Sequence, residues 1–442
     1  MKKPLHPIDF SHRRKQFLTK IKKGVAVFPA APEVIRNNDV HHEYRQDSNF
    51  FYLSGFEEPN SILLFANQTK TPFQMFVQPK DTTKELWEGK IIGPEGAKKH
   101  FGADAAFSSS DPSLFNEAFV KALLEADVLY YRLGLNEDWD RRIFSLMKKA
   151  VRQLGRTGRG FWPIHDPNEI LGEMRLIKTR AEAERLERAA NITAEAHVSA
   201  MKIAKPGMFE YEIEAALYHA FRGQGAGRLG YGSIVAGGSN ACVLHYVANN
   251  KYLEDKELLL IDAGAEFDYY TADITRCFPT NGQFTPEQRE IYSAVLKAQK
   301  SCVKMARPGK SMKDLHNHAI EVLVEELKNL KILKGSSASL IKQKAYLPFF
   351  PHGTGHWLGM DVHDSGRYFS ESYDTPRHLE PGMVITIEPG LYFGESSKGP
   401  SKYKGIGIRI EDDVLITSSG NKVLTTGAPK EIEEIESLCQ ST

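Results

Sequence analysis

Two aspartates in the second half of the chain have a spacing that could bind metal. Residues 258–278 read LLLIDAGAEFDYYTADITRCF, a pattern that predicts two strands joined by a turn centred at 267–268. In that register Asp262 lies opposite Asp273, and two buried carboxylates about 5 Å apart need a cation or a shared proton. In another register one of the two aspartates would face solvent.

A glycine-rich segment supplies three imidazoles. Residues 351–364 read PHGTGHWLGMDVHD and contain His352, His356 and His363. Glycine lets the backbone approach a ligand closely, so the pattern is compatible with a binding site. Each histidine taken alone is equally compatible with a purely structural role.

Two further acids interrupt apolar strands. Glu388 lies within VITIEPGLYF, and Glu411 ends GIGIRIE shortly after Arg409. Taken alone, each glutamate is compatible with a solvated position at the edge of a strand. The two glutamates, the two aspartates and the histidine cluster lie in one domain, and this combination favours a metal centre. Four carboxylates balance two divalent ions, and oxygen-rich ligation with one imidazole suits Mn²⁺, with Zn²⁺ or Co²⁺ as alternatives. Two such ions activate water and polarise a carbonyl, so the pattern predicts metal-assisted hydrolysis.

The elements that would position these groups divide into two domains. The stretch Gly155–Pro167 is rich in glycine and proline and predicts a boundary, with domains at 1–167 and 168–442. The first domain reads as mixed α/β. Its expected strands are 24–28, 50–53, 61–65 and 73–78, and its expected helices are 114–126 and 138–153.

The second domain alternates helices with strands, which is typical of an α+β domain around a bent antiparallel sheet. Its expected helices are 180–204, 210–222, 287–306 and 312–327. Its expected strands are 232–237, 241–247, 257–267, 270–278, 383–393, 404–411 and 412–417.

A weak internal repeat relates two parts of this domain. At an offset of 102 residues, Pro206-Gly207 matches Pro308-Gly309, and an acid followed by an aliphatic residue matches at 212–213 and 314–315. The repeat predicts two related halves with a site between them. The alternative is that a basic residue followed by Pro-Gly is simply a common way for a helix to end, without any repeat.

Composition narrows the function classes. The 442 residues carry 57 basic and 56 acidic side chains, which gives no electrostatic footprint for nucleic acid or an anionic membrane. Four cysteines without a CxxC pair argue against a disulfide framework or a thiolate zinc site. We find no secretory signal pattern and no membrane-spanning window, so we expect a soluble, cytoplasmic protein.

The order Asp, Asp, His, Glu, Glu resembles the ligand set of the pita-bread metallopeptidases, which include methionine aminopeptidase, prolidase and aminopeptidase P. The matching segments are LLIDAGAEFDYYTADITR, HGTGHWLGMDVHD, ITIEPGLY and GIRIEDD, with ligand spacings of 11, 83, 32 and 23 residues. These spacings, and residues 44–65, resemble bacterial aminopeptidase P over nearly the whole chain. The resemblance implies a creatinase-like α/β N-terminal domain followed by a pita-bread catalytic domain with a bent antiparallel sheet.

The resemblance also implies roles for individual residues. The implied metal ligands are Asp262, Asp273, His356, Glu388 and Glu411, with Asp273 and Glu411 touching both ions. The implied catalytic residues are His245, His352, His363, Glu388 and Arg409, and the implied substrate contacts are His245, His352, Tyr392, Arg409 and Trp87. Trp87 would reach a neighbouring subunit's site in a homodimer or homotetramer, although a packed surface aromatic is the alternative.

The activity implied is release of the first residue from peptides with proline at the second position, with two divalent ions, most simply Mn²⁺. A prolidase, which cleaves only dipeptides, has the same ligand order and stays as an alternative. A methionine aminopeptidase is disfavoured because the whole first domain would be surplus. A metal-free binding module or creatine-cleaving relative is disfavoured because no ligand is missing.

Overall fold

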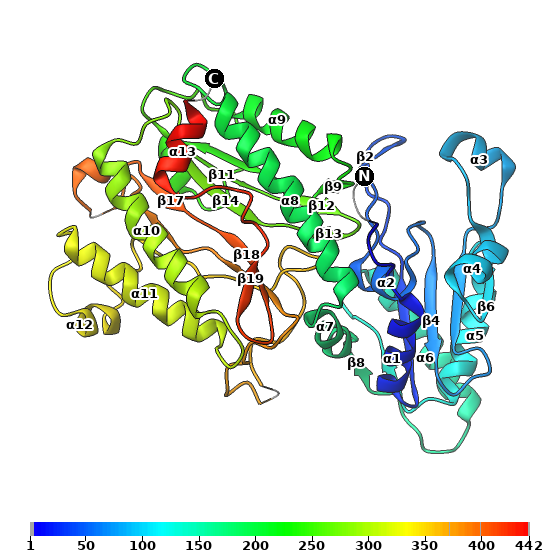
Figure 1. Cartoon of the computed structure of the whole chain (residues 1–442). Helices are drawn as coiled ribbons and strands as arrows, with labels where there is room; N and C mark the ends of the chain where they lie inside the picture. The colour runs from blue at the N-terminus through cyan, green and yellow to red at the C-terminus, as the bar shows by residue number, and fades with distance from the viewer. Residues whose placement is uncertain (1–3, 371, 398, 441–442) are drawn as a thin grey trace. The chain divides into compact units, whose positions relative to one another are not determined.

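The computed structural model describes residues 4–370, 372–397 and 399–440 (Figure 1). The chain divides into two compact units, one spanning Ile8–Met174 and the other beginning at Arg175 and including the N-terminal residues up to Pro7. The domain boundary predicted at Pro167 stays a prediction, and the compact units divide between Met174 and Arg175.

The first unit is built on a six-stranded mixed sheet in the order β6-β5-β4-β1-β7-β8. The strands are β1 (Gly24–Pro29), β4 (Ile62–Ala66), β5 (Phe73–Val77), β6 (Ala105–Ser108), β7 (Val128–Tyr130) and β8 (Ile164–His165). A separate hairpin joins β2 (Ile35–Asn37) to β3 (Val40–His41). The helices are α1 (Phe10–Ile21), α2 (Ser48–Ser54), α3 (Thr82–Glu88), α4 (Gly93–Phe101), α5 (Pro112–Leu124), α6 (Glu137–Leu154) and α7 (Asn168–Leu176), which runs across the division.

The strand predicted at 50–53 is wrong, because these residues lie in helix α2. The Asp47 side chain accepts a hydrogen bond from the Phe50 N–H and so caps the helix start. Gly55, at φ 68°, ends the helix in the left-handed conformation. Buried residues face several directions in this short helix, so its apolar run imitates a buried strand.

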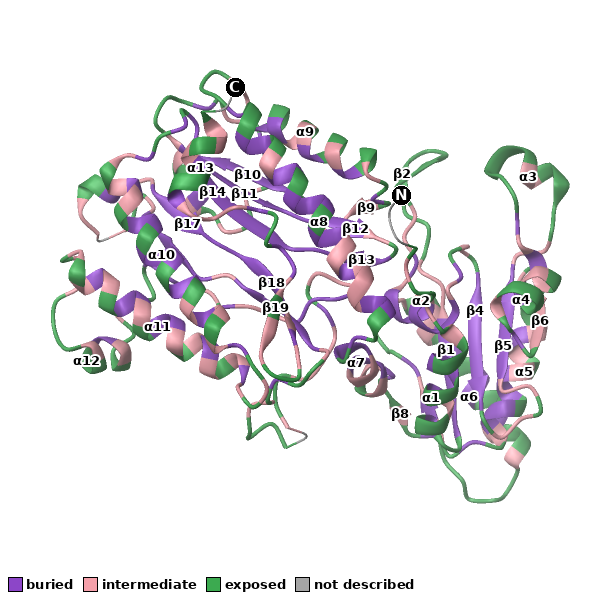
Figure 2. Ribbon diagram, viewed as in Figure 1, coloured by how far each residue is buried: buried purple, intermediate pink, exposed green. Residues whose placement is uncertain are grey.

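The second unit contains two helix pairs, each followed by a three-stranded antiparallel sheet. The first set is α8 (Arg180–Ile203), α9 (Glu210–Gly223), β10 (Ile234–Gly237), β11 (Leu258–Ala263) and β14 (Ile274–Pro279). The second set is α10 (Pro286–Met305), α11 (Met312–Asn329), β15 (Val384–Ile387), β18 (Asp412–Ile416) and β19 (Asn421–Val423). Figure 2 shows that the strands are largely buried, while the helices beside them are exposed on one face.

Shorter elements complete this unit. They are β9 (Arg228–Leu229), η1 (Gly238–Cys242), β12 (Ala265–Phe267), β13 (Tyr270–Thr271), α12 (Ser337–Lys342), β16 (Gly390–Tyr392), η2 (Ser401–Tyr403), β17 (Gly407–Arg409) and α13 (Ile432–Cys439). The strand predicted at 241–247 is wrong, since this segment starts in a 3₁₀ turn and continues as irregular chain. Among the described residues, no helix is long and apolar enough to cross a membrane.

The internal repeat has a structural basis. The Phe209 N–H donates to the Glu212 carboxylate at the start of α9, and the Ser311 N–H donates to Asp314 at the start of α11. Both preceding glycines have positive φ, 96° at Gly207 and 83° at Gly309. The matched positions therefore set the same turn into the second helix of each pair.

The predicted register of the aspartate hairpin is wrong by two residues. Asp262 pairs with Thr275, not with Asp273, because the two left-handed turn residues are Asp268 (φ 49°) and Tyr269 (φ 70°). Side chains alternate between faces with a period of two, so this shift keeps both aspartates on the same face. The expected proximity of the two carboxylates survives for that reason.

Candidate metal centre

Two strand ends of the first sheet bring Asp262 and Asp273 together. Asp262 lies in β11, and Asp273 comes just before β14. The Tyr231 hydroxyl lies between them, with its oxygen 2.6 Å from Asp262 Oδ1 and 2.5 Å from Asp273 Oδ1. A hydroxyl has one proton to donate, so it satisfies only one of the two carboxylates at a time.

The second sheet contributes Glu388, directly after β15, and Glu411, directly before β18. His356 lies on the neighbouring segment, which pairs with β15 through the Thr386 N–H donating to the His356 carbonyl. A Cβ on Gly355 would come 2.0 Å from the Thr386 carbonyl oxygen, so this approach requires glycine. At Gly355 the close backbone approach is therefore to strand β15 of the same unit, and not to a ligand.

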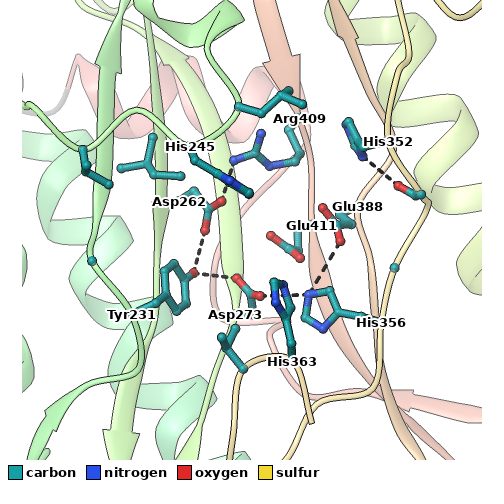
Figure 3. A pocket seen from close by; sticks show the side chains of 17 residues that line it. Tyr231, His245, Asp262, Asp273, His352, His356, His363, Glu388, Arg409 and Glu411 are labelled. Atoms are coloured by element: carbon teal, nitrogen blue, oxygen red, sulfur yellow. Dashed lines mark hydrogen bonds and ion pairs between the residues drawn. The ribbon is translucent and has the colours of Figure 1, made fainter. Parts of the chain in front are cut away.

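These side chains converge on one point (Figure 3). The His356 Nε2 atom lies 3.3 Å from Asp273 Oδ2 and 3.6 Å from Glu388 Oε1. Donor atoms of Asp273, His356 and Glu411 all lie within 4.8 Å of one another. The five predicted ligands line a single cavity of about 440 Å³ together with His245, His352, His363 and Arg409.

The electrostatics of this cluster are unfavourable without a cation. Burial raises the pKa of Asp262, and it raises the pKa of Glu388 to about 7. Burial and then the neighbouring carboxylate of Asp273 raise the pKa of Glu411 well above its usual value. For Asp273 burial acts upward too, but the His356 imidazole and the Tyr231 hydroxyl hold its pKa low. Four crowded carboxylates thus resist ionising together.

The donor set fits a divalent ion. The Oε1 atom of Glu411 is buried and has no hydrogen-bond partner among the described residues, whereas its Oε2 atom accepts from the Thr275 hydroxyl at 2.7 Å. An unpartnered buried carboxylate oxygen beside an imidazole and a second carboxylate is a metal-ligand arrangement. The donor atoms of Asp273, His356 and Glu411 can therefore hold a metal ion, and the roles of Asp262 and Glu388 as ligands stay predictions.

The remaining predicted residues differ in their placement. Arg409 donates to Asp262 and, at 3.1 Å, to the Tyr392 hydroxyl, which lies 2.8 Å from His352 Nε2. Tyr392 thus supports two cavity residues from behind. Burial and Arg409 lower the pKa of His352 to about 4, so this imidazole is neutral at physiological pH.

His363 and Trp87 lie in contrasting surroundings. The His363 ring packs edge-on against the His356 ring, with centroids 4.4 Å apart. Trp87 belongs to helix α3 of the first unit, where 83% of its surface is exposed. Its role at a neighbouring subunit stays a prediction.

Sequence reasoning missed Tyr231 and Thr275, which hydrogen-bond to carboxylates of the predicted ligands. Thr275 lies two residues after Asp273, on the same strand face, and this alternation was a usable signal. Tyr231 stands between two glycines far from any predicted ligand, so nothing local singled it out.

A buried ion cluster anchors the segment that carries His363. Arg175 donates to Asp361 at 2.6 Å and to Asp364 at 2.5 Å, and Lys178 donates to Asp364 at 3.0 Å. Asp364, Arg175 and Lys178 have almost no exposed side-chain surface. Asp361 and Asp364 flank His363, so the cluster holds this part of the loop.

Replacing Asp364 with asparagine should destabilise the protein by about 3–5 kcal/mol, because Lys178 would keep a buried charge without a carboxylate. Urea unfolding measures this loss, and Asp361→Asn is the matched control, with a smaller expected effect because Asp361 is 39% exposed. Although burial raises it, the pKa of Asp364 is lowered by Arg175 and Lys178.

The lowered pKa predicts a direction for the pH dependence. The unfolded chain takes up the Asp364 proton first, near pH 3.9, so this contribution is present above that pH and is lost as pH falls toward the folded pKa. Asp364→Asn should weaken this acid dependence. An equal loss of stability in Asp361→Asn and Asp364→Asn would contradict the assignment.

Comparison with known proteins agrees with this arrangement. Residues 184–418 match the Metallopeptidase family M24, and residues 10–130 match the Aminopeptidase P, N-terminal domain. The chain belongs to metallopeptidase family M24. The expected fold class, a creatinase-like α/β domain followed by a pita-bread domain with an antiparallel sheet, is confirmed.

Individual relatives carry a more specific name. The chain is 43% identical to the Xaa-Pro aminopeptidase of Haemophilus influenzae, over 97% of this chain and 96% of that protein. It is 41% identical to the Xaa-Pro aminopeptidase of Escherichia coli, over 97% of both proteins. Aminopeptidase PepP from Pseudomonas aeruginosa has a similar structure, with a TM-score of 0.92, 41% identity and 97% of each chain covered.

Proposed function

We propose that this protein is a dinuclear-metal aminopeptidase that hydrolyses the bond between the first residue of a peptide and a proline at the second position. The observation that carries the proposal is the convergence of four carboxylates and one imidazole on a single cavity. Relatives named Xaa-Pro aminopeptidases, matched over nearly their whole length, support the specificity.

Asp262, Asp273, His356, Glu388 and Glu411 would hold the two ions, with Asp273 and Glu411 contacting both. When bound, the ions supply activation of a water molecule and polarisation of the scissile carbonyl. Oxygen-rich ligation with one imidazole favours Mn²⁺ over Zn²⁺ or Co²⁺. The unpartnered Glu411 oxygen supports this assignment of the ligands.

The chain's own groups perform the proton transfers. Glu388 accepts the proton of the attacking water and passes it to the leaving proline nitrogen. His363 stabilises the negative charge that develops on the carbonyl oxygen. Their positions in the lining of one cavity support both roles.

A proline at the second position of the substrate requires specific recognition by the pocket. An Xaa-Pro bond has no N–H to donate, and the ring restricts φ, so the enzyme must recognise the ring itself. His245, His352 and Arg409 would contact the proline and the residues after it. Hydrogen bonds to the Tyr392 hydroxyl hold His352 and Arg409 in place and support this assignment.

We also propose a cytoplasmic homodimer or homotetramer in which Trp87 reaches the active site of a neighbouring subunit. The exposure of Trp87, with 83% of its surface accessible, leaves the ring free for such a contact. Apart from its own subunits, we expect the protein to bind peptides with proline at the second position. The near-balanced charge offers no surface for nucleic acid.

Purified protein should release arginine from Arg-Pro-Pro in the presence of Mn²⁺ and lose this activity on addition of a chelator. Arg-Ala-Ala is the matched substrate control, and the dipeptide Arg-Pro tests the prolidase alternative. Cleavage of the dipeptide alone would replace the proposal with a prolidase. Absence of cleavage with every divalent metal tested would reject the enzyme assignment.

A further inference from the structure

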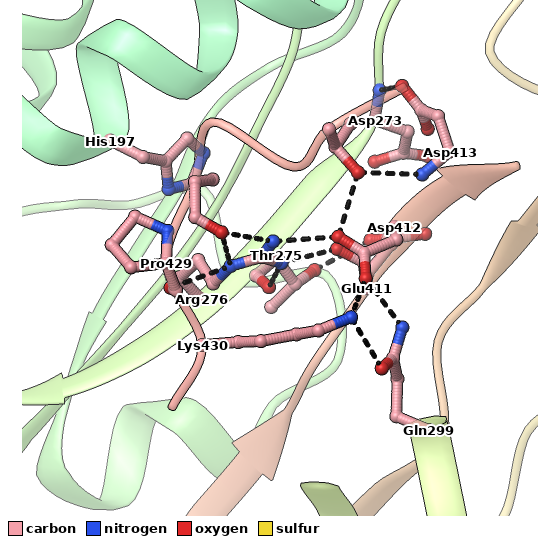
Figure 4. Close-up of polar contacts among 12 residues, drawn as sticks. His197, Asp273, Thr275, Arg276, Gln299, Glu411, Asp412, Asp413, Pro429 and Lys430 are labelled. Carbon is pink, nitrogen blue, oxygen red and sulfur yellow. Dashed lines mark hydrogen bonds and ion pairs between the residues drawn. The ribbon is translucent and has the colours of Figure 1, made fainter. Parts of the chain in front are cut away.

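Behind the cavity lies a wholly buried arginine that the proposed mechanism does not use. Arg276 follows Thr275 in β14 and has no exposed surface (Figure 4). Its Nη1 atom donates to the Thr275 carbonyl at 2.9 Å and also to the Glu411 carbonyl. Its Nη2 atom donates to Asp412 at 2.7 Å. One guanidinium therefore joins the two strand ends that carry Asp273 and Glu411.

The same guanidinium holds a third segment. The Arg276 Nε atom donates to the carbonyls of Ala428 and Pro429, at 3.2 and 3.1 Å, and Nη2 donates to Ala428 at 2.8 Å. The next residue, Lys430, donates to Asp412 and to Gln299. Residues 428–430, which we term the C-terminal tie, thus form one end of the network.

Asp412 is the acceptor at the centre of this network. Besides Arg276 and Lys430, it accepts from Gln299 Nε2 at 2.8 Å and from the Thr425 hydroxyl at 2.7 Å. A buried carboxylate with this many donors is held in one orientation. Because Asp412 directly follows Glu411, the network also restrains the backbone of that metal ligand.

The restraint continues to the ligand oxygens. The Glu411 N–H donates to the Thr275 carbonyl at 3.1 Å, and the Thr275 hydroxyl donates to Glu411 Oε2 at 2.7 Å. The Asp273 N–H donates to Asp413 at 3.1 Å, on the other side of Asp412. A displacement of β14 against the start of β18 would therefore separate Asp273 from Glu411, the two residues assigned to contact both ions.

We infer that Arg276 is a positioning residue for the metal centre, and that with the C-terminal tie and Asp412 it sets the separation of Asp273 and Glu411. This inference rests on the proposed function, because it assigns the two acids as shared metal ligands. Groups that orient metal ligands typically change metal affinity by about 10–100-fold when removed. A purely structural arginine would change folding stability alone.

The test is Mn²⁺ titration of the metal-free protein by calorimetry, at a temperature well below its unfolding transition. Arg276→Lys keeps the charge but loses the planar fork, and Arg276→Met removes both. Lys430→Met disturbs the same network from the C-terminal tie. The matched control is Arg289→Met, which releases Glu436 of α13 without touching Arg276.

Arg276→Met and Arg276→Lys should bind Mn²⁺ about 10–100-fold more weakly than the wild type. Lys430→Met should also weaken binding, but to a smaller degree. Arg289→Met should bind Mn²⁺ as the wild type does. If Arg276→Met does not fold, the Mn²⁺ affinities of Arg276→Lys and Lys430→Met test the inference. Wild-type Mn²⁺ affinity in folded Arg276→Lys and Lys430→Met would overturn the inference. A wild-type protein that binds none of Mn²⁺, Zn²⁺ and Co²⁺ in the same titration would reject the proposed function instead.

Discussion

Asp273→Asn is expected to weaken Mn²⁺ binding by more than about 100-fold and to abolish peptide hydrolysis at ordinary metal concentrations. Removing groups that merely orient ligands costs about 10–100-fold, so loss of a shared ligand should exceed that range. Asp273 Oδ2 also lies 3.3 Å from His356 Nε2, so the substitution removes the negative charge beside that imidazole. Calorimetric titration and the metal content after dialysis measure the effect.

Asp268→Asn is the matched control for this substitution. Asp268 lies at the turn of the same hairpin, where φ is 49°, a conformation that asparagine tolerates well. The same change of a carboxylate to an amide should therefore leave metal binding and activity unaltered. Retention of wild-type Mn²⁺ affinity by Asp273→Asn would remove it from the ligand set.

Glu388→Gln is expected to lower kcat by about 10²–10⁴-fold even at saturating Mn²⁺, because the amide cannot accept and return the proton. The Glu388 carboxylate is half-buried and lies 3.6 Å from His356, within the cavity that the substrate would enter. Its removal also takes away one ligand oxygen, so the metal content must be measured on the same samples as the rate.

Glu380→Gln provides the comparison, since Glu380 is exposed in the segment leading into β15 and its carboxylate pairs with Arg377. This variant should keep full activity. If Glu388→Gln retained wild-type kcat with both metals bound, the proton-transfer role would be wrong, although its role as a ligand could stand. A loss of activity that tracked metal content alone would assign Glu388 to ligation only.

Most of the helices and strands that the local patterns predicted are present in the structure. The long helices of the second unit begin and end within a few residues of their predicted positions, because capping residues and apolar periodicity are local signals. The two failures, at 50–53 and 241–247, are short apolar segments. Such segments are compatible with a strand, a short helix or an irregular path, and burial by the rest of the chain decides between them.

The hairpin register shows a different limit. The turn is one position later than predicted, because Asp268 and Tyr269 both adopt left-handed conformations. A pattern of residue types gave no reason to prefer that turn over its neighbour. The face of each aspartate was nevertheless correct, since a two-residue shift leaves the alternation unchanged.

The sequence by itself determined the types and order of the candidate ligands, because an acid at the end of an apolar strand is visible locally. Only the tertiary structure decided what supports them. Tyr231 meets Asp262 and Asp273, Arg409 meets Asp262 across 147 positions, and Arg276 meets Asp412 across 136. Contacts between such distant residues arise from the packing of two sheets, and no local periodicity encodes which side chains that packing brings together.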